Sequence, residues 1–391
     1  MLDRSIIGLQ ISHWIGANAI TVASASQILS AIAGSMMTIA SLVFSLTLTT
    51  LTLASQQLGP RLIEWFMNNR LTQMVLGSYI GLFIFTLLGI GSVNSGDSFN
   101  PHITVVAAIA GTVGNLILLV IYVHRAATNI QADTVISGSG SALVASIESR
   151  NRLFRDHETP TTTRSADGEL DPVTSSRSGY IQGIDFSTLR DLARKQDGVI
   201  RLERRIGDFV VDGLPLAQCW SPEGESVEEA VRAAFVFGPK RTSAQDIEFA
   251  LRGLVEIALR ALSPGINDPF TANACIDQIG SALVKLMHGP DTPENLADDN
   301  GVACLFIREP MLADFAATGF NAIRHAGADN ELVADRLAET QLMLHDLARS
   351  EEHRNLWKTH LQRTLATAER CLAEPEARRH LQEKIQAGLR W

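Results

Sequence analysis

Three long apolar stretches in the first third of the chain predict helices that cross a membrane. They run from about Ala31 to Ser55, from Met74 to Val93 and from Ile103 to Val123, and none contains a charged residue. A helix needs ~20 apolar residues to span the hydrocarbon core of a bilayer. We therefore predict a transmembrane domain over residues 31–125, preceded by an extracytoplasmic or interfacial segment over residues 1–30.

The first apolar stretch has one hydroxyl-rich side. At 100° per residue, its small polar side chains fall on one arc of about 120°, and apolar side chains take most of the remainder. Such residues either let membrane helices pack closely and hydrogen-bond to each other, or line a water-filled path. Both interpretations are open for this hydroxyl stripe, which comprises Ser35, Thr38, Ser41, Ser45, Thr49, Thr52 and Gln56.

The other two apolar stretches carry signals for close helix packing. Gly77 and Gly81 form a G-x-x-x-G pair, the spacing that lets two membrane helices approach each other. Asn115 lies near the middle of the third stretch. An amide at this depth usually hydrogen-bonds to a neighbouring helix, and contact with a ligand or an ion is the alternative.

The pattern changes after the third apolar stretch. Residues 126–179 predict a continuation of the last helix, followed from His157 to Gly179 by a flexible linker with few large apolar residues. Residues 180–220 alternate apolar and polar positions and carry turn signals at Gly207 and Gly213, which predicts a small β-rich module. Ser187 is expected to cap a short helix within this module.

Residues 221–391 show the periodicity of amphipathic helices. Ser226 with Glu229 predicts one helix start, and Ser243 predicts another. Further helices are predicted near 271–288, 311–326, 331–349, 351–372 and 376–389. The predicted fold is an α-helical membrane protein with three transmembrane helices, followed by a cytoplasmic α+β domain that joins the β-rich module to a helical bundle.

Charge supports this division of the chain. Basic residues beside the apolar stretches, Arg61, Arg70 and Arg125, place the N-terminus outside and the α+β domain in the cytoplasm. Residues 1–178 carry 9 Lys and Arg and 10 Asp and Glu, whereas residues 179–391 carry 24 and 32. The excess of acidic residues in the second half argues against nucleic acid as a partner. The four widely spaced cysteines favour free thiols in a reducing compartment.

The start of the chain lacks the basic, apolar and small-residue pattern of a cleaved signal peptide. The first membrane span is therefore expected to direct the chain to the membrane.

Basic residues gather in the β-rich module. We interpret them as a surface that faces anionic lipid headgroups, with a phosphate-containing ligand as the alternative. They are Arg190, Arg194, Lys195, Arg201, Arg204 and Arg205.

One loop, within Ala261 to Asp277, carries candidate binding residues. Asp268 is a good N-cap and Pro269 a good first residue for the following helix, and such a joint needs no ligand. The alternative is a weak site for a cation or polar ligand at Asn267 and Asp268, with Glu256 nearby. No catalytic, metal-binding or nucleotide-binding motif occurs, so we expect neither an enzyme nor a cofactor nor a metal.

Two stretches of the chain resemble a family. The first is SMMTIASLVFSLTLTTLTLASQQLGPRLIEWFMNNRLTQMVLG with the later NPHITV, and the second is GDFVVDGLPLA with QDIEFALRGLVEIALRALSPGINDPFTANACID. They resemble the bacterial membrane protein family called domain of unknown function 2254, from about Ile28 to Leu286. The resemblance implies an inner-membrane protein with a cytoplasmic C-terminal domain, and it supplies no activity. Family members usually begin with an additional membrane helix, which this sequence is expected to lack.

Two functions follow from these patterns. We favour an oligomeric pore or permeation protein lined by the hydroxyl stripe and regulated by the cytoplasmic domain. The alternative is a membrane-anchored interaction or sensory protein without transport activity, whose cytoplasmic domain binds a protein or a small molecule. In both, the lipid bilayer is a partner. A homo-oligomer is expected, because three helices leave polar and small-residue faces uncovered.

Overall fold

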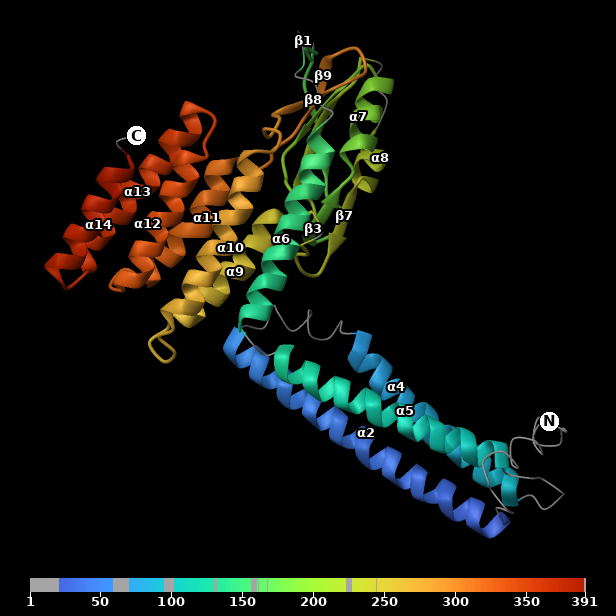
Figure 1. Ribbon diagram of the computed structural model, residues 1–391. Coiled ribbons are helices and arrows are strands. Elements are labelled where there is room, and N and C mark those ends of the chain that lie inside the picture. Colours follow the sequence, from blue (N-terminus) through green and yellow to red (C-terminus); the bar gives the residue numbers. More distant parts are fainter. Residues whose placement is uncertain are drawn as a thin grey trace. The chain divides into compact units, whose positions relative to one another are not determined.

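The computed structural model describes residues 21–58, 70–94, 102–129, 132–155, 160, 162–166, 168–222, 227–243 and 245–389. The chain forms two compact units, Met1–Thr134 and Val135–Trp391 (Figure 1). The described part of the first unit is helical, whereas the second unit combines sheets and helices.

The first unit contains three long helices, α2 (Val22–Leu58), α4 (Arg70–Asn94) and α5 (His102–Asn129). Each is long and apolar enough to cross a membrane, over Val22–Thr52, Arg70–Val93 and His102–Arg125. This confirms the three predicted spans as helices of suitable length and composition.

Helix α2 begins at Val22, nine residues before the predicted start at Ala31. The segment from Val22 to Ser30 contains no glycine or proline, and its apolar residues Ala25 and Leu29 are buried in the unit. Packing thus extends the helix into residues assigned to the interfacial segment, and that boundary was wrong. Residues 1–20 lie outside the described part of the chain.

The first unit has apolar side chains both in its interior and on its outer surface. Leu29, Met36 and Val43 of α2 lie in a core with Tyr79 of α4 and Val105 of α5. Other large apolar side chains face away from the three helices, and they include Leu42, Leu88 and Val120, each more than 60% exposed. An apolar exterior is what a lipid solvent requires.

The second unit begins with α6 (Ala132–Arg155), of which residues 135–155 belong to it, and continues with two sheets. The strands are β1 (Thr162–Thr163), β2 (Asp171–Thr174), β3 (Gly179–Ile184), β4 (Val199–Leu202), β5 (Phe209–Val210), β6 (Pro215–Trp220), β7 (Phe235–Gly238), β8 (Asn295–Ala297) and β9 (Val302–Phe306). One sheet has the order β1-β9-β4-β6-β2 with β8 on β9, and the other has the order β5-β3-β7. Helices α7 (Phe186–Lys195) and α8 (Glu228–Ala233) accompany them.

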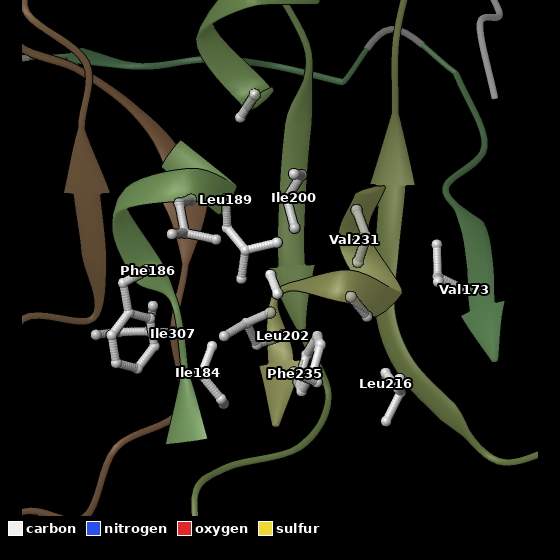
Figure 2. Close-up of a cluster of buried hydrophobic side chains, with 14 of the residues drawn as sticks. Val173, Ile184, Phe186, Leu189, Ile200, Leu202, Leu216, Val231, Phe235 and Ile307 are labelled. Carbon is white, nitrogen blue, oxygen red and sulfur yellow. The ribbon is translucent and has the colours of Figure 1, made fainter. Parts of the chain in front are cut away.

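The sheets and these helices enclose an apolar core (Figure 2). Phe186 and Leu189 of α7 meet Ile200 of β4, Leu216 of β6 and Phe235 of β7 there, and all five are buried. Gly207 and Gly213 lie at the predicted turns with φ of 90° and 85°, a region that glycine enters without strain.

The extent of the β-rich region differs from the prediction. Strands β1 and β2 lie inside the segment predicted as a flexible linker, and β7, β8 and β9 lie beyond residue 220. Strand β9 pairs in parallel with β4 and with β1, more than 100 residues earlier in the chain. Pairing over this separation leaves no local signal, so the predicted module limits were wrong.

The remaining helices form a bundle: α9 (Ile247–Ala261), α10 (Pro269–Met287), α11 (Leu312–Ala326), α12 (Glu331–Asp346), α13 (Glu351–Cys371) and α14 (Pro375–Gly388). The last five agree with the predicted ranges to within a few residues.

Two helix starts in the second unit differ from the prediction. Asp246, rather than Ser243, caps α9, and its carboxylate accepts a hydrogen bond from Phe249 N. Likewise Asp185, rather than Ser187, caps α7, because a carboxylate accepts several donors at once. Ser226 lies outside the described residues, and the helix predicted there starts at Glu228 after Val227.

Candidate functional site

The hydroxyl stripe of α2 lies on the outside of the three-helix unit. Its six described members, Ser35, Thr38, Ser41, Ser45, Thr49 and Thr52, are all exposed. Several of them donate to carbonyls of their own helix, as Thr38 does to Gly34 O at 3.0 Å and Thr49 to Ser45 O at 3.0 Å. The side chain of Gln56 lies outside the described part. The stripe therefore lines no path through the interior of the described unit.

The interior of the first unit contains a few polar contacts between helices. Asn115 Nδ2 donates to Ser78 O at 3.3 Å, and Tyr79 Oη donates to Asn115 O at 2.8 Å. Thr47, which lies off the stripe, is 2.6 Å from Tyr122 Oη. These contacts tie α5 to α4 and to α2.

Gly77 and Gly81 of α4 face open space. A Cβ added at either position would meet no described atom within 4 Å. The G-x-x-x-G pair is therefore not used for packing among α2, α4 and α5, and its surface is open to lipid or to another chain.

The loop between α9 and α10 is a capped joint. Asp268 accepts hydrogen bonds from Phe270 N, Thr271 N and Thr271 Oγ1, and the pKa of its carboxyl is lowered, chiefly by the Thr271 hydroxyl. Asn267 lies beside it with φ of 49°, and Glu256 lies in α9 more than a turn before that helix ends. In the described part of the chain, no group of three or more His, Cys, Asp or Glu could hold a metal ion.

Most basic residues of the β-rich region have partners. Arg194 pairs with Asp299 and Asp191, and Arg205 with Glu248 and Asp208. Arg190 lies 3.7 Å from Asp191, Arg204 donates to Pro215 O, and Arg201 lies over the Phe306 ring. Most of these basic side chains are therefore engaged in contacts within the second unit.

A cleft in the second unit was not predicted from the sequence. It measures about 700 Å³ and lies where α6, the segment after α10 and the starts of α11 and α13 meet. Its polar lining includes Arg150, His288, Asp291, Thr292, Arg349, Ser350, Glu352, His353, Asn355 and Thr359. These residues come from separate parts of the sequence, so no local motif marks them.

Arg150 shapes one wall of the cleft. Its guanidinium donates to Pro290 O and Thr292 Oγ1, and so holds the segment after α10 against α6. Nε of Arg150 is buried and has no hydrogen-bond partner among the described residues. Burial lowers the pKa of Arg150, whereas Glu309 and Asp291 act in the opposite direction.

Behind Arg150 lies a smaller hollow of about 30 Å³, room for one water molecule, which Glu309 and Asp246 also line. Burial raises the pKa of Glu309 to about 7, although the Arg150 charge opposes this. Asp246 is held differently, since Arg241 donates to both of its oxygens, at 2.6 and 2.8 Å. The pKa of the Glu309 carboxyl therefore lies near neutral pH, well above its ordinary value.

The other rim of the cleft is the start of α13. Ser350 caps this helix by accepting from His353 N, and the positive end of the helix dipole opens onto the cleft. Arg349 precedes the cap, is exposed, and has no ion-pair partner among the described residues.

A family model described as "Predicted membrane protein (DUF2254)" matches residues 1–342. The chain belongs to this family. The match covers the three apolar helices, the sheets and the helices through most of α12, so the family resemblance seen in the sequence is confirmed.

Curated relatives come from mycobacteria. The proteins named "Uncharacterized protein Mb1321c" of Mycobacterium bovis and "Uncharacterized protein Rv1290c" of Mycobacterium tuberculosis are each 28% identical over 334 residues. The alignment covers 82% of this chain and 63% of each relative, so the chain spans less than two thirds of their length. No solved structure matches.

Proposed function

We propose that this family member is a membrane-anchored sensory protein whose second unit binds a small anionic molecule in the 700 Å³ cleft. The observation that carries the proposal is the cleft itself, which has the size of a small-molecule site and gathers polar side chains from α6, the segment after α10 and the start of α13. The first unit then serves as an anchor in a bacterial inner membrane. The second unit lies in the cytoplasm, as the basic residues beside the spans favour.

The lining favours a ligand with an anionic group. Arg349 offers an unpaired cation at the rim, and the start of α13 offers the positive end of a helix dipole. Asp291 and Glu352 also line the cleft, so the ligand also carries hydrogen-bond donors. A small carboxylate or phosphate that bears hydroxyl or amino groups meets both conditions.

The test is a melting experiment on the full chain in detergent, with a panel of such carboxylates and phosphates. A ligand that binds only the folded state stabilises it, by about 2.7 kcal/mol at 100 times its dissociation constant. Arg349→Gln should remove the shift, because it deletes the unpaired rim cation. Arg354→Gln is the matched control, since Arg354 is an exposed arginine of α13 that pairs with Glu351 outside the cleft. Absence of any shift, or a shift that survives Arg349→Gln, contradicts the proposal.

A second function is an oligomeric pore formed between copies of the chain. Its support is the exposed position of the whole described hydroxyl stripe, with Gly77 and Gly81 also open, because these surfaces suit contact with another copy. Water would then pass between subunits, since the core of a single unit is apolar.

Cysteine labelling separates the two functions. In a Cys371→Ser background, cysteines at Ser41, Ser45 and Thr49 are compared with cysteines at Leu42 and Leu46, using a membrane-impermeant thiol reagent. Labelling of the three stripe positions alone supports the pore. Protection of all five positions supports the anchor.

A further inference from the structure

The joint between α9 and α10 exposes large apolar side chains. Phe270 is 73% exposed and Ile266 is 50% exposed, in a unit that otherwise buries most residues of this size. Leu332, at the start of α12, is 48% exposed and lines a shallow hollow together with Phe270. We define the apolar tip as Ile266, Phe270 and Leu332.

The backbone of this joint fixes the exposed side chains in place. Ser263 O accepts hydrogen bonds from Ile266 N and Asn267 N, and Ala261 O accepts one from Asp268 N at 2.8 Å. Asp268 then caps α10 through Phe270 N and Thr271 N. These bonds hold the backbone of the joint in a conformation that leaves Ile266 and Phe270 exposed.

The apolar tip lies at the end of the second unit where the chain enters it. Helices α6 and α10 run in the same direction, because Gly140 packs against Gln278 and Glu148 pairs with Lys285. Helices α10 and α12 also run in the same direction, because Asn273 donates to Leu332 O and His288 lies 2.9 Å from Leu347 O. The starts of all three helices therefore share one end of the unit.

A short segment joins the entry end of the unit to the third candidate span. The third candidate span ends at Arg125, and the second unit begins at Val135, ten residues later. Ten residues reach at most about 35 Å even when fully extended. By contrast Leu347, which is 43% exposed at the far end of α12, lies about 22 Å further along the helix than Leu332.

We propose that the apolar tip inserts into the lipid bilayer, with Phe270 as its main anchor. The transfer of aromatic and aliphatic side chains from water into a membrane interface lowers the free energy of the system. Residues 261–270 contain no lysine or arginine, so insertion is driven by apolar contact rather than by attraction to anionic headgroups. The proposal is independent of any ligand in the cleft.

The test uses the full chain reconstituted in phosphatidylcholine vesicles that contain spin-labelled lipids. Cys219, Cys275 and Cys304 are buried, so Cys371→Ser leaves a background in which one new cysteine carries an environment-sensitive fluorophore. Labels at Phe270→Cys and, as a second site, Ile266→Cys are compared with a label at Leu347→Cys, the matched exposed position at the far end.

The spin-labelled lipids should quench more than half of the emission from positions 270 and 266 and leave position 347 almost unchanged. The same result should hold when part of the phosphatidylcholine is replaced by phosphatidylglycerol. Equal quenching at 270 and 347 would overturn the proposal. So would protection of position 270 from aqueous iodide without lipid quenching, which indicates a protein partner, or quenching only in anionic vesicles.

Discussion

The two units satisfy their polar groups in different ways. In the first unit, hydroxyls such as those of Thr38 and Thr49 donate to the carbonyl four residues earlier in the same helix, and large apolar side chains face outward. In the second unit, carboxylates such as Asp246 cap helices and bind arginines. The difference indicates that each unit is built for its own solvent, because lipid offers no hydrogen bonds and water offers many.

The largest effect should come from removing a buried side chain of the second unit. Trp357 is fully buried and donates toward Met287 Sδ, so Trp357→Ala should lower the free energy of unfolding by about 3–5 kcal/mol. Leu88→Ala should change it little, because Leu88 is 67% exposed on α4 and faces the detergent. Denaturant unfolding of both variants in the same detergent measures this. Similar losses would mean that the outer face of α4 is packed against protein.

The next effect concerns the buried carboxyl group of Glu309 and its contribution to stability. The pKa of Glu309 is about 7 in the folded chain against an ordinary value of 4.5. The stability that this difference contributes is therefore fully present below pH 4.5 and is lost as the pH rises through 7. Glu309→Gln should thus stabilise the protein by roughly 1–3 kcal/mol at pH 8 and have almost no effect at pH 4.5. Melting curves over this pH range test it, and a gain that does not depend on pH would refute it.

A smaller effect is expected at the cap of α10. Asp268→Ala should cost about 1 kcal/mol, whereas Asp268→Ser should be nearly silent, because a serine oxygen also accepts the free N–H groups. Equilibrium unfolding of the two variants gives the comparison. A ligand-dependent melting shift that Asp268→Ser abolishes would instead favour a binding site at Asn267 and Asp268.

The smallest effect should come from a hydrogen bond between membrane helices. Tyr79→Phe removes the donor to Asn115 O, and such bonds contribute about 0.6 kcal/mol on average in membrane proteins. Unfolding in mixed detergent and denaturant measures the loss, with Ser92→Ala as the control, since that hydroxyl donates to Leu88 O of its own helix. A loss of several kcal/mol would show that this hydrogen bond contributes far more than is usual between membrane helices.

Local signals in the sequence predicted the helices well. The apolar runs gave α2, α4 and α5, and the Asp268-Pro269 pair marked the start of α10, because capping and periodicity act within a few residues. The sheet was underestimated, since β9 reaches β4 and β1 across more than 100 residues. The cleft was missed for the same reason, as Arg150 meets Thr292, 142 residues later.

The direction of the hydroxyl stripe could not be predicted either. Periodicity places Ser45 and Thr49 on one side of α2, but only packing against α4 and α5 decides whether that side faces inward or outward. The structure places it outward, which moves the preferred function from the first unit to the second.

Solute flux through proteoliposomes tests most directly whether the first unit only anchors the chain. If it does, vesicles containing the full chain should release small ions and neutral solutes no faster than protein-free vesicles. The Ser45→Leu/Thr49→Leu variant should then behave identically. Flux well above the protein-free rate that this double variant abolishes would show that the first unit is more than an anchor and would establish a pore along the hydroxyl stripe.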